Sequence, residues 1–528
     1  MRLTSGLWAT AAYVLFGATT VHCFSKSSPL TPPELDAGVT YDAATYDAGN
    51  VPSRDGASPD AAAFDASADA SADATPDATP DAGPSGVLDT AFNATGFVSK
   101  TGTAGALTNR DDGARGVAID SMGRVVVAGG SQGGAGQGHS VAAWRLTSQG
   151  AFDPTFGTQG AWSKTGTLGG MYDDGWAVTI DSQDRPVLAG TSNNGSPISS
   201  TAWRLDTTGK LDPSFAGTGY VGMSNTTGGP QGYDLAAGVL RTANDGVFLV
   251  GYSEHSNNAI DMVVWKYTSA GALDTAGFGA PNGFIATKQT ASPMQALYWD
   301  GATSAVVDSA GRIVVAGWSM KDAASHDAVT VWRFTSAGAP DASFHGTGYF
   351  TLSNPTNLAG AWTSDTATGI VLDASGRIVV AGYSFGPTVW SGWALRLTAN
   401  GDPDATFGTS GVVALPPATM GATASAMANA VALDSHGRIV VAGMTAAKPT
   451  GSKGSSVAAW RLTPSGAIDL TYGVNGVFSA TGAAGGTGVD AGDSASALAI
   501  DSSDRAVLAG TSLNATGEAT MTVWRLTP

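Results

Sequence analysis

The sequence has almost no capacity for covalent cross-linking by disulfides. It contains one cysteine, Cys23, among 528 residues, so no disulfide within the chain can support the fold. Charged residues make up only 13% of the chain, and 43 acidic against 26 basic residues give a net charge of −17. An acidic chain without a basic patch argues against nucleic acid as a partner and against electrostatic docking on anionic lipid.

Long apolar runs are also scarce. One such stretch occupies residues 7–21, after Arg2, and about 15 apolar or small residues are short for a membrane span. This pattern predicts an export signal at residues 1–23. Its end at Cys23 indicates a lipoprotein signal with Cys23 lipidated, although His22 stands where such signals place a small residue. Ordinary signal cleavage and an uncleaved membrane anchor remain alternatives.

Residues 24–85 hold few large apolar side chains. Asp, Ala, Pro, Ser and Thr alternate there in near-repeats, and this composition buries too little apolar surface to offset the entropy of ordering the chain. We expect a disordered acidic linker that like charges and prolines keep extended. As a tether it would hold the following domain away from a membrane, and a passive spacer would behave in the same way.

After residue 86, one phrase recurs seven times. It reads Asp-Ser-x-Gly-Arg-Ile-Val-Val-Ala-Gly, then Trp-Arg-Leu-Thr, then Gly-x-x-Asp-x-x-Phe-Gly. Its spacing of about 61 to 67 residues is the period of a supersecondary unit. The glycine that closes the first part stands at Gly129, Gly190, Gly251, Gly317, Gly382, Gly443 and Gly510.

Each unit predicts four β-strands and no helix. In the first unit they are residues 114–119, 124–128, 141–146 and 160–164, which are rich in Val, Ile, Trp and Thr and separated by turn residues. Four strands in each of seven units predict an all-β protein, a seven-bladed β-propeller over residues 86–528.

The two ends of the repeat region complement each other. The last unit stops at residues 524–528 without its Asp-x-x-Phe segment, and that segment occurs at residues 88–96. We therefore expect residues 86–100 to pair with the last strand, so that an N-terminal strand completes the seventh blade and closes the ring.

Four residue series repeat with the units, which is typical of a scaffold and not of a site. We expect the two aromatic series to pack between blades and the two charged series to form turn and ion-pair elements. The third-strand aromatics are Trp144, Trp203, Trp265, Trp332, Trp460 and Trp524, with Leu395 in the fifth unit. The basic residues after them are Arg145, Arg204, Lys266, Arg333, Arg396, Arg461 and Arg525. The acidic residues are Asp89, Asp153, Asp212, Asp274, Asp341, Asp404 and Asp469. The second aromatics are Phe92, Phe156, Phe215, Phe278, Phe344, Phe407 and Tyr472.

The phrases at residues 117–129, 144–147 and 152–157 resemble the delta-60 repeat family, which is found on large bacterial surface and secreted proteins. The resemblance covers every unit, and the third unit departs most, because Thr242 and Gly246 replace the turn Asp and Arg. It implies a propeller and an exported bacterial setting. The family has no known catalytic motif, so the resemblance implies no activity.

Loop variation divides the expected disk into two faces. Connections between strands one and two, and between strands three and four, are nearly identical among units. The other connections all differ, as residues 131–135 and 318–322 illustrate. In an up-and-down blade the two sets lie on opposite faces, here called the uniform face and the variable face. Variable loops on a rigid repeat scaffold are typical of binding surfaces.

One acidic series belongs to the variable face. An Asp lies eight residues before the turn Asp in six units, and Ala426 replaces it in the sixth. The plainer interpretation is six local turn caps. The alternative is a ring of carboxylates at the channel mouth that binds a cation, with Ca²⁺ as the expected ion. The six residues are Asp112, Asp173, Asp234, Asp300, Asp365 and Asp493.

Aromatic residues accompany this series in neighbouring units. Tyr172, Tyr233 and Trp299 directly precede the Asp of units two to four, and Trp362 lies three residues before the Asp of unit five. Aromatic faces beside carboxylates suit sugar rings, so these four residues are candidate ligand contacts. Packing between blades is the alternative.

These patterns favour an exported, envelope-tethered propeller that binds a glycan or an envelope or surface protein through its variable face. A polysaccharide lyase or hydrolase, or a lactonase, is the enzymatic alternative, and the less favoured one because we find no catalytic residue set. A purely structural surface protein is the third. We expect a monomer on the outer membrane or surface of a bacterium, otherwise periplasmic or secreted, that meets the membrane only through its lipid anchor.

Overall fold

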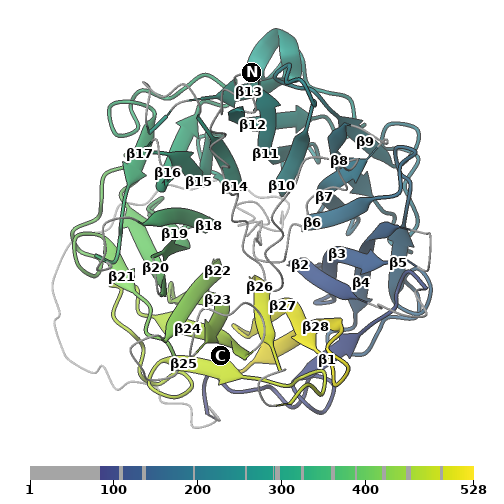
Figure 1. The fold of residues 1–528 in the computed structure, drawn as a ribbon, viewed down its shortest axis with the longest axis vertical. Helices are drawn as coiled ribbons and strands as arrows, with labels where there is room; N and C mark the ends of the chain where they lie inside the picture. Colours follow the sequence, from purple (N-terminus) through teal and green to yellow (C-terminus); the bar gives the residue numbers. More distant parts are fainter. Residues whose placement is uncertain are drawn as a thin grey trace, which may run out of the picture.

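The computed structural model describes residues 84–528 with gaps. These gaps are residues 106–110, 134–137, 194–196, 256–258, 289, 292–297, 323–325, 358–362, 387–388, 419–423, 447–453 and 488–490. The predicted export signal, Cys23 and nearly all of the predicted linker lie outside the described residues. The described chain forms a ring of seven four-stranded antiparallel sheets around a central axis (Figure 1), which confirms the predicted all-β, seven-bladed propeller.

Each blade runs from an inner strand, next to the central axis, to an outer strand at the rim. Blade 1 comprises β2 (Asp112–Ile119), β3 (Val125–Gln132), β4 (His139–Leu146) and β5 (Ala161–Lys164). Blade 2 comprises β6 (Asp173–Ile180), β7 (Pro186–Asn193), β8 (Ile198–Arg204) and β9 (Tyr220–Met223). Blade 3 comprises β10 (Asp234–Arg241), β11 (Val247–His255), β12 (Ala259–Tyr267) and β13 (Phe284–Thr287), and the five-residue turn η2 (Gly279–Gly283) precedes β13.

The remaining blades repeat this order. Blade 4 comprises β14 (Asp300–Val307), β15 (Ile313–Met320), β16 (Asp327–Phe334) and β17 (Tyr349–Leu352). Blade 5 comprises β18 (Ser364–Leu372), β19 (Ile378–Phe385), β20 (Trp390–Leu397) and β21 (Val412–Ala414). Blade 6 comprises β22 (Ser425–Leu433), β23 (Ile439–Ala446), β24 (Ser455–Leu462) and β25 (Val477–Ala480). Blade 7 comprises β26 (Asp493–Ile500), β27 (Ala506–Leu513), β28 (Ala519–Leu526) and β1 (Phe97–Lys100). Within the described residues, no helix is long and apolar enough to cross a membrane.

The ring closes through the N-terminal strand, as predicted. β1 pairs antiparallel with β28, with Phe97 opposite Trp524 and Lys100 opposite Met521. A separate bridge joins Leu88 to Leu526. In the other six blades, all four described strands are consecutive in the sequence. In the last blade, β1 from the opposite end of the described chain covers the otherwise open edge of β28.

Repeated side chains fill the space between blades. The repeated third-strand Trp is fully or almost fully buried in the six blades that have it. In six blades the next residue is an Arg whose guanidinium lies over the second aromatic, as Arg145 does over Phe156 at 4.6 Å. The same guanidinium donates from Nε to Asp153 at 2.8 Å. The predicted ion pairs therefore form, and they join strand three to the loop that follows it.

The fifth blade shows how one exception to the repeat is accommodated. Leu395 stands at the Trp position, but Trp393, two residues earlier on the same face of β20, is fully buried in its place. Its Nε1 donates to Oγ of Ser384 at 3.2 Å. A Cβ at Gly382 would lie 2.4 Å from the Trp393 ring, so the glycine provides the required space.

Every inner strand contains a β-bulge at the same place, and in four blades the bulged side chain bonds to the next blade. Thr303 Oγ1 donates to the carbonyl oxygen of Ala367 at 2.8 Å, and Thr368 Oγ1 donates to that of Ala428 at 2.9 Å. Bulges redirect side chains in this way. The seven bulged residues are Arg115, Trp176, Ala237, Thr303, Thr368, Asn429 and Ser496.

Candidate functional site

The six Asp residues of the variable-face series are inside the blades. Asp112, Asp173, Asp234, Asp300 and Asp493 each begin an inner strand, Asp365 is the second residue of β18, and all six are 0% exposed. They do not present free carboxylates at the channel mouth. The geometry agrees with the plainer interpretation, in which each carboxylate organises its own blade.

Blade 4 shows the arrangement in full. Thr290 donates its backbone N–H and its Oγ1 to Asp300 Oδ2 at 3.1 and 2.7 Å, and Ser319 Oγ donates to Oδ1 at 2.5 Å. Trp332 Nε1 donates to Thr290 Oγ1 at 3.0 Å. Blades 1 to 3 repeat this Trp–Thr–Asp chain. Because the carboxylate fixes the loop that enters the blade, we call this arrangement the entry network.

Burial dominates the electrostatics of the entry network. It raises the pKa of Asp112, Asp173, Asp300 and Asp493, and it raises the pKa of Asp234 to about 6, while hydrogen bonds from Ser and Thr side chains act in the opposite direction. The described residues contain no group of three or more His, Cys, Asp or Glu side chains that could hold a metal ion. The Ca²⁺ hypothesis therefore has no ligand cluster in its support and stays a prediction.

The predicted aromatic contacts occupy different environments. Trp299 is buried, 8% exposed, in a cluster with Tyr298 and Met320. Tyr172 and Tyr233 are half-buried on the variable face. Trp362 lies outside the described residues. The structure thus keeps the two tyrosines accessible and places Trp299 between blades.

A second set of residues breaks the repeat at one junction. Arg115, Gly130, His139 and Asp174 stand at positions where no other unit has the same residue type. In the structure all four meet between blades 1 and 2, on the variable-face side. Together with Tyr172 they form what we call the first-junction site. Comparing equivalent positions across the seven units would have revealed this site, whereas a search for catalytic motifs does not.

Gly130 creates the space in the first-junction site. A Cβ at this position would lie 2.2 Å from His139 Cε1 and 2.4 Å from Asp174 Oδ1. The imidazole edge and the carboxylate therefore share the volume that a side chain would fill. The equivalent residues in the other units all have side chains: Thr191, Tyr252, Trp318, Tyr383, Met444 and Thr511.

Asp174 is the centre of a charged network. Arg115 Nη1 forms a short ion pair with Asp174 Oδ1, and Tyr172 Oη donates to Oδ2 at 3.3 Å. The guanidinium lies over the ring of Trp176 at 4.7 Å. Arg115 Nε and Trp176 Nε1 are buried donors without a protein acceptor. Buried donors without a protein acceptor also occur in the scaffold, at Trp524 Nε1 and Arg525 Nη2, so these two do not by themselves mark a binding site.

His139 has a defined orientation. Its Nδ1 lies 2.9 Å from the carbonyl oxygen of Asp173, and its ring stacks on Tyr172 with centroids 5.0 Å apart and 21° between planes. A carbonyl only accepts, so the neutral imidazole carries its proton on Nδ1 and its lone pair on Nε2. Nε2 of the half-buried ring can therefore accept a hydrogen bond.

A second acidic group lies between blades 3 and 4. Asp261 Oδ2 is 3.6 Å from Nδ1 of His255, which itself contacts the carbonyl oxygen of Thr227 at 3.0 Å. Burial raises the pKa of Asp261 to about 6, against the attraction of His255. Asp261 also departs from the repeat, since the equivalent residues are Ser, Ala or Thr.

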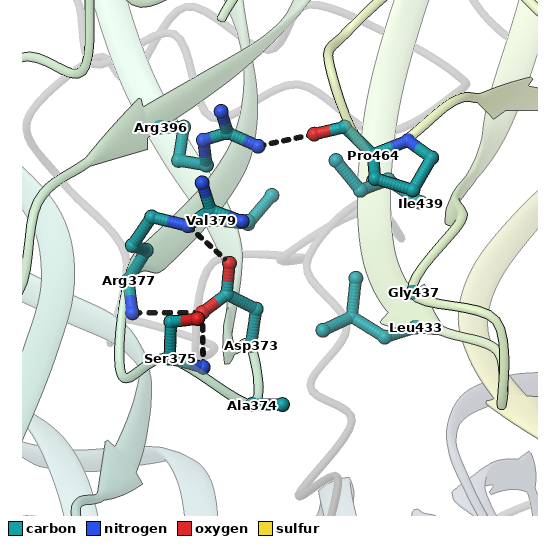
Figure 2. A pocket seen from close by; sticks show the side chains of 10 residues that line it. All are labelled: Asp373, Ala374, Ser375, Arg377, Val379, Arg396, Leu433, Gly437, Ile439 and Pro464. Atoms are coloured by element: carbon teal, nitrogen blue, oxygen red, sulfur yellow. Dashed lines mark hydrogen bonds and ion pairs between the residues drawn. The ribbon is translucent and has the colours of Figure 1, made fainter. Parts of the chain in front are cut away.

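The uniform face contains one described cavity, between blades 5 and 6 (Figure 2). Its volume is about 120 Å³, and Arg377, Arg396, Ala374, Gly437 and Pro464 are among its lining residues. The two arginines are already engaged, Arg377 with Asp373 at 2.6 Å and Arg396 with the carbonyl oxygen of Pro464. Because both arginines are engaged within the scaffold, the cavity is not a candidate site.

The fold and the comparisons define the class of protein as a β-propeller. Residues 311–344 and 374–407 match a family described as "Domain of unknown function (DUF5122) beta-propeller". Among curated proteins, none matches the sequence. The delta-60 resemblance is compatible with this family match, which does not itself confirm it.

Several solved structures match this chain at low similarity. Polysaccharide lyase Uly1 is 10% identical, with a TM-score of 0.40 over 78% of this chain and 89% of the other. A PL25 ulvan lyase bound to its saccharide is 12% identical, with a TM-score of 0.40 over 80% and 93%. A gluconolactonase from Xanthomonas campestris is 12% identical, with a TM-score of 0.28 over 65% and 82%. At these values the likeness supports no inference about what this chain binds.

Proposed function

We propose that this chain is an exported, envelope-tethered propeller of the delta-60 type that binds a glycan or a surface protein through the first-junction site. One observation supports this most strongly: four departures from the repeat, Arg115, Gly130, His139 and Asp174, are mutually dependent and meet on the variable face. Scaffold residues repeat in every blade. A group that breaks the repeat together, with His139 and Asp174 packed against Gly130, is better explained by a ligand on the adjoining variable face than by the scaffold.

The site offers hydrogen-bond donors and acceptors beside an aromatic face. His139 Nε2 can accept a hydrogen bond, and Tyr172 supplies a half-buried ring and a hydroxyl. Asp174, paired with Arg115, holds the Tyr172 hydroxyl in place. Sugar hydroxyls and peptide amides are ligands of matching chemistry. In this proposal the Cys23 lipid and the acidic linker at residues 24–85 keep the propeller near an outer membrane, and Tyr233 extends the surface toward blade 3.

Glycan and peptidoglycan arrays probed with the full chain test this proposal. Wild type is expected to bind, and His139→Ile, which installs the residue of blades 2 and 3, is expected to weaken binding by about tenfold, ~1.4 kcal/mol. Arg115→Thr with Asp174→Gly removes both charges together and should act in the same direction. Met122→Ser, on the uniform face where Met122 is 60% exposed, is the control. Unchanged binding in the first two variants contradicts the site, and no ligand at all favours a structural surface protein.

A second candidate is an enzyme acting on a polysaccharide or a lactone, and the orientation of His139 favours it. An imidazole with Nδ1 fixed by a carbonyl and Nε2 available is suited to general base catalysis. Incubating the full chain with uronate polysaccharides and sugar lactones, with His139→Gln as control, tests for product release. A chain that binds a glycan and releases no product contradicts the enzymatic candidate and leaves the binding function standing.

A further inference from the structure

Lys321 introduces a primary amine at the junction between blades 4 and 5. It directly follows β15, and its Nζ donates to the carbonyl oxygen of Thr363 at 2.7 Å and lies 3.3 Å from Oδ2 of Asp365. The side chain of Lys321 is 20% exposed and that of Asp365 is 0% exposed. The amine is therefore fixed against a fully buried carboxylate of the neighbouring blade.

A second carboxylate, Asp327, lies at the same junction, in contact with Ser364 and electrostatically coupled to the pair. Asp327 begins β16, and Ser364 Oγ donates to its Oδ2 at 2.9 Å, while its Oδ1 is buried without a partner. Burial raises the pKa of Asp327 to about 6, and the charge of Asp365 acts in the same direction. Asp327 can therefore hold a proton close to neutral pH, next to the Lys321–Asp365 pair.

Both Lys321 and Asp327 break the repeat. Other units have Gly133, Asn194, His255, Gly386, Ala447 and Asn514 at the position of Lys321. They have His139, Ile198, Ile260, Trp390, Ser455 and Ala519 at the position of Asp327. Only at the junction of blades 4 and 5 do a lysine and a second acid accompany the entry-network Asp. The other junctions form without them, so the scaffold does not require Lys321 and Asp327.

We propose that Lys321 and Asp365 form an intramolecular isopeptide bond, with Asp327 as the neighbouring acid. A proton passes from the Lys321 ammonium to the Asp365 carboxylate, and the neutral amine attacks Cγ of Asp365. The C–N bond forms, the bond from Cγ to Oδ1 breaks, and one water leaves. The attacking nitrogen loses one proton and the departing oxygen gains one, and protonated Asp327, which is electrostatically coupled to both partners, relays this proton. No oxidant or other co-reactant is needed.

The two oxygens of Asp365 are unequal in the way this step requires. Oδ2 accepts the backbone N–H of Asn354 at 2.7 Å and Thr363 Oγ1 at 3.1 Å, and these donors stabilise the negative charge that develops on the oxygen that stays. Oδ1 is buried without a partner, so its departure breaks no hydrogen bond. The product joins β18 to the segment after β15 covalently, in a chain whose single cysteine allows no internal disulfide.

Peptide mass mapping of the purified full chain tests the bond. Wild type should yield one linked peptide pair, lighter by one water than its two parts, with no tryptic cleavage after Lys321. Lys321→Arg keeps the ion pair and should lose the link. In Asp365→Asn, formation of the link should release ammonia in place of water. The linked variant then has the same mass as linked wild type, whereas the two unlinked chains differ in mass.

Asp327→Ala tests the acid separately, since it leaves both bonding partners in place. We expect the linked fraction to fall at least tenfold in this variant. A link that forms undiminished without Asp327 overturns the role given to that residue. Wild-type peptides recovered only in unlinked form, from a chain shown to be folded by its circular dichroism, show an ordinary ion pair and overturn the proposal.

Discussion

Arg525, in the last strand, donates from Nε to Oδ2 of Asp89, at the start of the described chain, over 2.7 Å. Arg145 and Asp153 make the same contact at 2.8 Å within blade 1. The N-terminal segment therefore supplies the seventh blade with the acid that each other blade supplies from its own unit. It also supplies Phe92, whose ring lies 4.6 Å from the Arg525 guanidinium.

Deleting residues 86–100 should destabilise the whole ring. The deletion leaves Arg525 as a buried charge without its acid, which costs about 3–5 kcal/mol, and it exposes the edge of β28. Differential scanning calorimetry should show a broad transition at lower temperature. A deletion of the same length inside the linker, residues 60–74, is the control and should change nothing. A ring that melts as sharply without residues 86–100 would contradict closure by this segment.

Replacing an entry-network Asp should destabilise the domain without any metal. In Asp300→Asn, an amide replaces the carboxylate that accepts from Thr290 and Ser319, so at least one donor loses its acceptor. We expect a loss of about 1–3 kcal/mol in the free energy of unfolding, measured by urea denaturation in EDTA. Repeating the measurement with Ca²⁺ distinguishes the alternatives. If Asp300→Asn stabilises the metal-free domain and removes a Ca²⁺-dependent rise in Tm, the carboxylates form a cation site instead.

The fold could be predicted because its determinants repeat. Each strand, turn and ion pair occurs about seven times, so exceptions such as Thr242 and Gly246 do not obscure the pattern. The structure shows that the third turn still forms, because Arg241 and Asp245 make a reversed ion pair at 2.8 Å. Similarly, Trp393 replaces the missing Trp at Leu395 from the same strand face.

The candidate site was harder to predict because it depends on contacts between units. His139 is only one of several scattered histidines in the sequence, and Gly130 is one of 72 glycines. Their relation to Asp174 becomes visible once two neighbouring blades are placed in register. The burial of the Asp series was missed for the same reason, since a regular series at strand starts does not reveal whether the carboxylates point into the blade or into the channel.

The domain should be more stable at pH 5 than at pH 8. Burial raises the pKa of Asp234 and Asp261 to about 6, above the usual value of about 3.9 in an unfolded chain. The folded state therefore binds these protons first, and stability rises as pH falls through 6. One pKa unit is worth about 1.4 kcal/mol, and pH 5 lies about one unit below the folded-state pKa of Asp234, so this group should add roughly 1.4 kcal/mol between pH 8 and pH 5.

Stability should decline again below about pH 4. Below this pH, protonation of the ion-paired acids dominates the pH dependence of stability. Burial acts to raise the pKa of Asp153, but hydrogen bonds from Thr155 and Arg145 lower it. The stabilising effect of Asp153 is lost when its carboxylate is protonated. Tm measured from pH 3 to 8 should thus pass through a maximum near pH 5. Asp261→Asn should flatten the rise between pH 8 and 5. A Tm that falls steadily from pH 8 downward would be inconsistent with these buried acids.

Filling the cavity of Figure 2 should stabilise the ring. At three other junctions, a Ser in one turn donates to an Asp in the next, as Ser121 does to Asp184 through Oγ at 2.5 Å and through its N–H at 3.0 Å. Between blades 5 and 6 the corresponding residues are Ala374 and Gly437, which cannot make this contact, and the cavity lies there.

The double variant Ala374→Ser with Gly437→Asp restores the contact. Gly437 has φ 70°, and the three native Asp residues adopt φ 56–58° at the same turn position, so the backbone tolerates Asp. A Cβ at Gly437 would have its nearest contact at 4.0 Å, so no clash opposes the change. One added hydrogen bond pair should raise the free energy of unfolding by about 0.5–1.5 kcal/mol, measured by urea denaturation. Ala374→Ser alone, which lacks the acceptor, is the control and should give no gain. If the double variant is no more stable than this control, the Ser–Asp contacts do not stabilise the junctions, and the cavity is a neutral consequence of drift between the turns.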